Sequence, residues 1–148
     1  MQEIAEFVAV VACGLFVGAA VYISLVEHPA RMECGEELAA TVFRPSYRRA
    51  TVMQATLAAL GFLSSIAAWL GGGTFWWMIG GLVLGAVVPF TLIVILPTNK
   101  QLLSPTLDKQ SARTKELLER WGALHAVRSV LSAVAFLLFV YLVIFRRA

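Results

Sequence analysis

Long apolar stretches separated by two polar segments dominate the pattern of this chain. Residues 7–26 contain no charged side chain, and a second uncharged stretch extends over residues 50–99. An apolar α-helix needs about 20 residues to cross the hydrocarbon core of a bilayer. The first stretch therefore predicts one crossing, and the second is long enough for two. The glycines at 71–73 mark the turn between these two crossings, because glycine accepts turn conformations that other residues avoid.

A fourth apolar stretch near the C-terminus completes the predicted architecture. It ends at Arg146 and Arg147, which we expect at the far membrane interface. Pro89 lies inside the third helix, where the missing backbone donor predicts a kink. Apolar residues recur near helical spacing before Pro45, which predicts a short interfacial helix in the first cytoplasmic loop. We expect an all-α integral membrane four-helix bundle, a single membrane domain at 1–148 with spanning helices at about 4–27, 47–70, 74–97 and 117–145.

Composition supports the membrane assignment and argues against nucleic acid as a partner. Hydrophobic residues make up 59% of the 148 residues and charged residues only 14%, whereas a soluble domain carries about 25% charged residues. The net charge of +3 is split between two short segments and forms no basic stripe. The N-terminus carries Glu3 and Glu6 where a secretory signal has Lys or Arg, so we expect the first helix to be retained.

Lysine and arginine concentrate in the two polar loops and predict the orientation of the protein. The glycine turn and the N-terminal tail have none, the C-terminal tail has two, and the loops have nine: Arg31, Arg44, Arg48, Arg49, Lys100, Lys109, Arg113, Lys115 and Arg120. Cytoplasmic loops carry the excess of such residues. We expect a multi-pass protein of the cell membrane with both polar loops in the cytoplasm and both termini outside. The pairs Gly14–Gly18 and Gly81–Gly85 favour close helix packing within the bundle and leave a homo-oligomer open.

One stripe of the fourth helix concentrates the candidate chemistry. Spacing of i, i+4, i+7 and i+11 places four residues on one face: Trp121, His125, Arg128 and Ser132. An arginine at membrane depth is costly and normally faces the bundle interior or a wet cavity. We expect His125 and Arg128 to project into such a cavity, with Glu27 as the acidic partner of Arg128 ahead of Glu116 and Glu119. The alternative is that Arg128 snorkels to the interface and His125 only caps a helix contact.

The two histidines of the chain raise the question of a metal site. His28, His125 and Glu27 offer two imidazoles and a carboxylate, the ligand set of mononuclear non-haem iron sites. Neighbours on a helix point about 100° apart, so Glu27 and His28 do not naturally address one ion. We therefore predict no metal ligand and no firm cofactor. Iron or copper, or a haem, on His28 and His125 is the alternative.

Motifs at the helix ends resemble those of a known family. The third helix closes with the sequence PTNKQL at 97–102, and the fourth opens with LLERWGALHAVR at 117–128. Together with the EHPAR ending of the first helix at 27–31, they are similar to the anthrone-oxygenase-like family of four-helix membrane proteins. The likeness covers nearly the whole chain. The family is largely a domain of unknown function, and a few members oxidise an anthrone to an anthraquinone with O₂.

The resemblance implies a membrane-embedded oxidoreductase that uses O₂ on a small apolar aromatic or phenolic substrate, which would enter sideways from membrane lipid. An imidazole titrates near neutral pH and can abstract a proton, and a guanidinium stabilises an oxyanion. We expect catalytic roles for His125, Arg128 and Glu27. The expected substrate-binding residues are Asn99, Arg120, Trp121, His28 and Arg31. A non-enzymatic small-molecule- or lipid-binding protein, or an accessory subunit, is the competing interpretation, since it needs only the bundle and its interfacial arginines.

Overall fold

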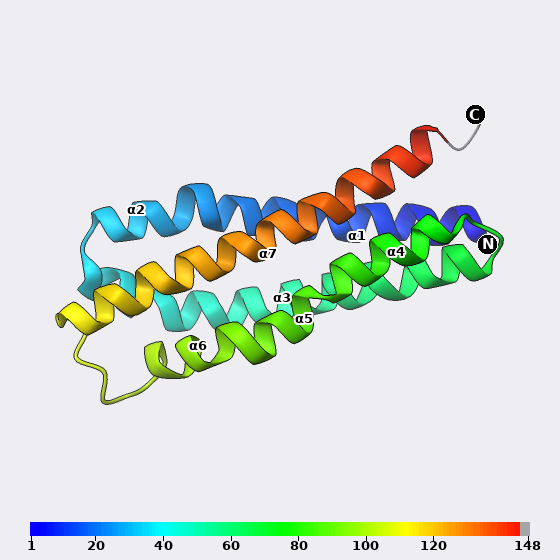
Figure 1. The fold of residues 1–148 in the computed structure, drawn as a ribbon. Helices are drawn as coiled ribbons and strands as arrows, with labels where there is room; N and C mark the ends of the chain where they lie inside the picture. Colours follow the sequence, from blue (N-terminus) through cyan, green and yellow to red (C-terminus); the bar gives the residue numbers. More distant parts are fainter. Residues whose placement is uncertain (146–148) are drawn as a thin grey trace.

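The computed structural model describes residues 1–145 as four helical rods that run side by side (Figure 1). Each rod is long and apolar enough to cross a membrane, so the predicted all-α four-helix membrane fold is confirmed. The elements, with η for a π-helical segment, are α1 Gln2–Tyr22, η1 Ile23–Glu27, α2 His28–Glu33, α3 Glu36–Leu70, α4 Phe75–Gly85, α5 Val87–Phe90, η2 Thr91–Ile95, α6 Leu96–Leu102 and α7 Ala112–Ile144. Arg146 and Arg147, expected at the far interface, lie outside the described residues.

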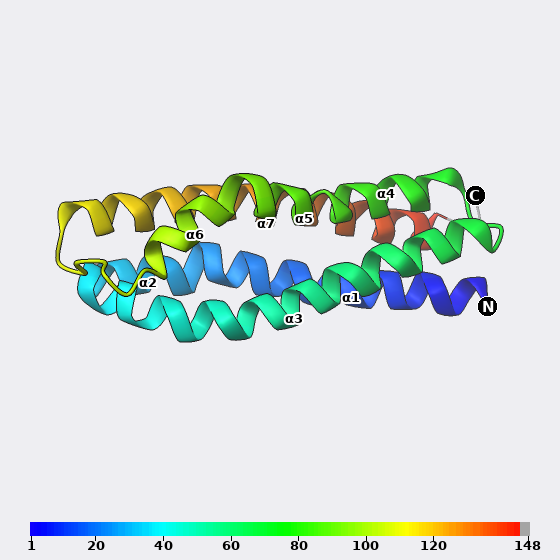
Figure 2. The ribbon, with the colours of Figure 1, turned by 90° about the horizontal axis from the view of Figure 1, so that it is seen from below.

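The two polar loops lie at one end of the bundle and the glycine turn lies at the other. Figure 2 shows the N-terminus and the end of α7 beside the glycine turn, away from both polar loops. Gly35 and Gly72 form the two tight turns, with φ of 92° and 106°, a region that favours glycine. The polar loops therefore share one end, as expected. That this end of the bundle faces the cytoplasm stays a prediction from the positive-inside rule.

The first and third rods extend beyond the ends expected from the sequence, about residues 27 and 97, because each continues as helix past a proline. The first rod continues past Pro29 to the end of α2, and the third continues past Pro97 to the end of α6. A π-helical segment precedes each proline, and the His28 N–H bonds to the Ile23 carbonyl, five residues back. The same i→i−5 bond closes η2. This wider spacing accommodates a residue that has no backbone donor.

Two further prolines show how the membrane helices bend and extend. The segment expected as a short interfacial helix is helical, but it is continuous with the second spanning helix, because α3 runs through Pro45. Pro45 and Thr41, whose carbonyl loses its usual partner, are exposed, so water can satisfy the freed group. In the third rod, the sequence predicts a kink at Pro89, and the structure has a break between α4 and α5 at Ala86, three residues before this proline.

Small residues bring the rods together around two apolar clusters. One cluster near the glycine turn contains Phe16, Leu84 and Phe139, and a second near the polar end contains Phe43 and Trp121. The space around the glycines shows how closely the rods approach. A Cβ on Gly14 would lie 2.9 Å from the Phe136 ring, whereas Gly18 faces open space. Close packing within the bundle is thus present at one member of that pair, and a homo-oligomer stays a prediction.

Candidate functional site

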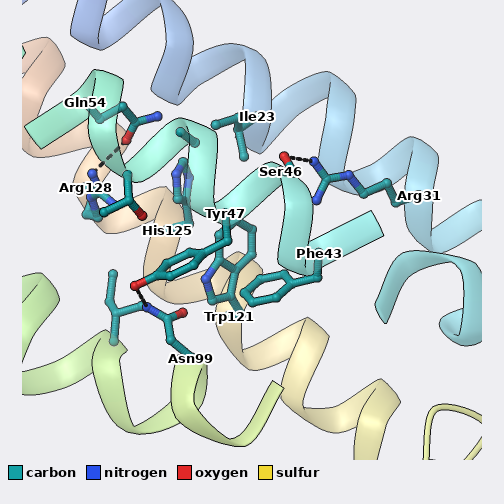
Figure 3. Close-up of a pocket in the computed structure, with 13 residues that line it drawn as sticks. Ile23, Arg31, Phe43, Ser46, Tyr47, Gln54, Asn99, Trp121, His125 and Arg128 are labelled. Atoms are coloured by element: carbon teal, nitrogen blue, oxygen red, sulfur yellow. Dashed lines mark hydrogen bonds between the residues drawn. The ribbon is translucent and has the colours of Figure 1, made fainter. Parts of the chain in front are cut away.

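A polar cavity of about 40 Å³ lies among the four rods, between the apolar clusters (Figure 3). Every rod contributes to its wall, so the site exists only in the assembled bundle. Its lining residues are Ile23, Arg31, Phe43, Ser46, Tyr47, Ala50, Thr51, Gln54, Ile95, Asn99, Trp121, His125 and Arg128. Five of the eight residues that the sequence assigns to a site therefore share one cavity: Arg31, Asn99, Trp121, His125 and Arg128.

Regular helix spacing brings these side chains together. On α3, Tyr47, Thr51 and Gln54 follow at i, i+4 and i+7, and on α7 the stripe of Trp121 does the same. The other two rods turn toward the cavity at their π-helical segments: Ile23 begins η1 and Ile95 ends η2. Such segments occur frequently at functional sites.

Arg128 is a cation without a carboxylate partner among the described residues. Its Nη2 donates to Oε1 of Gln54 at 2.7 Å, and the guanidinium carbon lies 5.5 Å from the Phe16 ring centroid. The Nε atom is buried with no hydrogen-bond partner. The expected Glu27–Arg128 ion pair is wrong, because Glu27 lies one helical turn from Arg31 and pairs with it instead.

Arg31, unlike Arg128, has a carboxylate counter-ion within the described part of the chain. It is 8% exposed and forms an ion pair with Glu27, and its Nη2 donates to the Ser46 hydroxyl at 2.8 Å. Ser46 in turn donates to Glu27 at 3.3 Å. Glu27 itself faces an outer groove between the first rod and α3 rather than the cavity. The arrangement of Glu27 is that of a counter-ion for Arg31.

The aromatic wall of the cavity centres on Trp121. Its ring stacks on His125 with centroids 4.8 Å apart and meets the edge of Phe43 at 5.2 Å. His28 also packs on Trp121, at 5.2 Å, but it does not line the cavity. Arg120 is exposed, because it precedes Trp121 and so points about 100° away around the helix. Neither His28 nor Arg120, both expected to bind substrate, therefore lines the cavity.

The residues do not fit the metal site that the two histidines suggest. Within residues 1–145, no three potential ligands from His, Cys, Asp and Glu come together. Glu27 is paired with Arg31, and the Nδ1 atom of His125 lies 3.0 Å from the Ser24 hydroxyl. With the carboxylate and one ring nitrogen already engaged, we derive no chemical step through a metal.

Unpartnered polar atoms converge on the cavity. Asn99 donates from Nδ2 to the Tyr47 hydroxyl at 3.3 Å, and its Oδ1 has no partner. Among the described residues, the buried side-chain atoms without a partner are Asn99 Oδ1, Gln54 Nε2, Arg31 Nε and Arg128 Nε, and all four residues line this cavity. Buried polar groups are normally satisfied by protein or water. The cavity is large enough for water and offers three donors and one acceptor to a ligand.

A second, mostly apolar pocket of about 150 Å³ adjoins the cavity between α3 and the α5–η2 segment. The two spaces share Tyr47, Thr51, Gln54 and Arg128. The outer wall includes Ala55 and other residues whose side chains are exposed on the flank of the bundle. This lateral pocket therefore leads from the lipid-facing surface toward the polar cavity.

Sequence reasoning missed several residues of this site. Tyr47 lies in the first polar segment beside Arg48 and Arg49, and Gln54 lies in the stretch 50–99, which the sequence marks only by its lack of charge. The signal was present, since an amide within a spanning helix is costly unless it finds a partner. Ser24 and Ser129, which contact His125, carried no signal of their own, because serine is common in membrane helices.

The family model for anthrone oxygenase matches residues 43–138, a region that contains α3 from Phe43 onward, the third rod and most of α7. The chain belongs to the anthrone oxygenase family. In this anthrone oxygenase family member, eleven of the cavity residues lie inside the matched region, and Ile23 and Arg31 lie before it. No curated protein and no solved structure matches the chain.

Proposed function

We propose that this anthrone oxygenase family member oxidises an apolar aromatic or phenolic substrate with O₂ at the polar cavity. The observation that carries the proposal is the guanidinium of Arg128, held beside His125 without a carboxylate partner among the described residues. A charge at membrane depth is costly. A bundle that retains one in a polar cavity has it available for negative charge that develops during a reaction.

The chemistry follows from the acidity of a benzylic CH₂ group conjugated to a carbonyl, as in an anthrone. His125 takes one proton, and the remaining electron pair delocalises onto the carbonyl oxygen, where Arg128 stabilises the negative charge. The anion reduces O₂ and forms a C–O bond, and the resulting peroxide anion takes the proton back from His125. His125 then takes the second C–H proton, and that C–H electron pair forms the C=O bond as the O–O bond breaks. The leaving hydroxide takes the proton from His125 and becomes water. The balance is CH₂ + O₂ → C=O + H₂O, so no further reductant is needed.

The dimensions of the site favour substrate access from the membrane. A cavity of about 40 Å³ holds water but not three fused rings, so a substrate of that kind also needs the lateral pocket of about 150 Å³. Tyr47, Gln54 and Arg128 line both spaces, so we expect the Tyr47–Asn99 and Arg128–Gln54 hydrogen bonds to separate when a ring passes from one space to the other. Trp121 then offers a flat aromatic surface for stacking.

Oxygen uptake by the purified protein in lipid nanodiscs, with an anthrone as substrate, tests this proposal. We expect O₂ consumption and quinone formation in a 1:1 ratio. His125→Ala should lower kcat by about 10²–10⁴-fold, the usual contribution of a general base. Arg120→Ala is the matched control, because this exposed arginine of the same helix should leave kcat unchanged. A wild-type protein that consumes no O₂ with a panel of anthrones and phenols would favour a non-enzymatic binding protein instead.

A further inference from the structure

A chain of two serine hydroxyls connects the His125 ring to the backbone of the first rod. The Ser24 hydroxyl lies 3.0 Å from Nδ1 of His125 and 2.8 Å from the Ser129 hydroxyl. Ser129 Oγ lies 3.0 Å from the Ala20 carbonyl oxygen and 3.3 Å from that of His125. Ser24 belongs to the π-helical segment η1, so this contact lies where the first rod departs from regular α-helix.

The number of protons available fixes which group donates in each of these hydrogen bonds. Each hydroxyl has one proton, and a backbone carbonyl can only accept. Ser129 must therefore donate to a carbonyl, which leaves its oxygen to accept from Ser24. With its only proton committed to Ser129, Ser24 must accept from a protonated Nδ1 of His125. If Nδ1 had no proton, Ser24 would have to donate to it, and one of the other two hydrogen bonds would be lost.

We propose that Ser24 and Ser129 are positioning residues that hold neutral His125 in its Nδ1–H tautomer and leave Nε2 as the proton acceptor. Ser24 does not line the cavity and His125 does, so the ring turns its Nδ1 edge away from the cavity. Within residues 1–145, no hydrogen bond occupies Nε2. The inference rests on the proposed function for one point only: the substrate supplies the proton that Nε2 accepts.

The carbonyl acceptors at the end of this hydrogen-bonded series determine where a proton on His125 can go. The last acceptors are carbonyl oxygens of Ala20 and His125, which cannot pass a proton onward. A proton taken by Nε2 therefore has no exit through the serines. It stays on the imidazole until the cavity side takes it back, which matches its return to the peroxide anion.

The tautomer can be measured on the resting protein without any substrate. Protonated and unprotonated ring nitrogens have well-separated ¹⁵N chemical shifts, and the chain has only two histidines, so His28→Gln assigns the His125 signals. We expect wild-type His125 to be protonated at Nδ1. Ser24→Ala should move the ring toward the Nε2–H form, whereas Ser24→Thr, which keeps the hydroxyl, should preserve the wild-type signals.

Ser132→Ala is the matched control, because the Ser132 hydroxyl contacts only the carbonyls of Arg128 and Ser129 among the described residues. It should change neither the tautomer nor turnover. In the oxygen-uptake assay, Ser24→Ala should lower kcat roughly 10-fold to 100-fold with little change in KM, since a wrong tautomer removes the base. An Nε2–H tautomer in the wild type, or an unchanged tautomer in Ser24→Ala, overturns the inference. An inactive wild type with the Nδ1–H tautomer would overturn the proposed reaction and leave the positioning role intact.

Discussion

Replacing Arg128 with glutamine is expected to stabilise the protein while it removes activity. The guanidinium has no carboxylate partner among the described residues, and its contacts are one hydrogen bond to Gln54 and the Phe16 ring. An arginine in the middle of a spanning helix costs about 2.5–3.5 kcal/mol. A glutamine is uncharged, and its amide can still donate to Gln54. The site thus holds a charge that the fold alone does not need.

The size of the effect follows from these contacts. Weakening the charge-assisted hydrogen bond costs about 1 kcal/mol, and losing the cation–π contact costs about 0.5–1 kcal/mol. Against the cost of burying the charge, Arg128→Gln should stabilise the bundle by about 1 kcal/mol. Loss of an oxyanion donor should lower kcat by about 10²–10³-fold.

Arg31→Gln provides the matched comparison, because Arg31 has a counter-ion. Removing one partner of a buried ion pair costs about 3–5 kcal/mol. The Glu27 side chain is 30% exposed, so solvent reduces this to a destabilisation of about 2 kcal/mol. Unfolding by SDS in mixed micelles, followed by circular dichroism, measures both changes. We expect a gain of about 1 kcal/mol from removing the charge. If Arg128→Gln instead unfolds more easily than the wild type, by about 1 kcal/mol or more, the effect has the opposite sign, Arg128 is a structural residue and the reasoning fails.

Three further outcomes follow from the packing. Ala55→Trp should obstruct the lateral pocket and lower kcat/KM for a lipid-soluble substrate at least about tenfold. Ala59→Trp, one turn further along the same exposed face, should leave kcat/KM unchanged. Equal effects of the two substitutions would exclude lateral access. Tyr47→Phe removes the partner of the Asn99 amide and should destabilise the bundle by about 1–2 kcal/mol in SDS unfolding, against no change for the exposed Tyr22→Phe. Gly122→Ala places a Cβ 2.5 Å from His28 Nε2 and should lower the thermal unfolding temperature. Gly18→Ala, which faces open space, should leave it unchanged or raise it, and the opposite order would contradict the packing described.

The spanning helices and the stripe on α7 could be predicted because each depends on a local pattern. Charge-free length marks a crossing, and the spacing of Trp121, His125 and Arg128 fixes which side chains share a face. Their burial then follows from the cost of placing such groups in lipid. Asn99 was found through the family motif rather than through spacing.

The partners of these residues could not be predicted, because they depend on how each rod is rotated. A π-helical segment adds a residue to a turn and shifts every later side chain around the axis. Since η1 ends at Glu27, ideal α-helical geometry misplaces both Glu27 and His28. Of the three arginines that the sequence assigns to the site, Arg31 and Arg128 line the cavity and Arg120 does not, and Glu27 pairs with Arg31 rather than with Arg128.

The most direct test of the central claim is a structure of the protein with the quinone product bound in a lipid environment. The account predicts that the rings lie in the lateral pocket, that one carbonyl oxygen is within hydrogen-bonding distance of the Arg128 guanidinium, and that the Tyr47–Asn99 bond has opened. A quinone bound only in the outer groove between the first rod and α3, with the polar cavity unchanged, would contradict it.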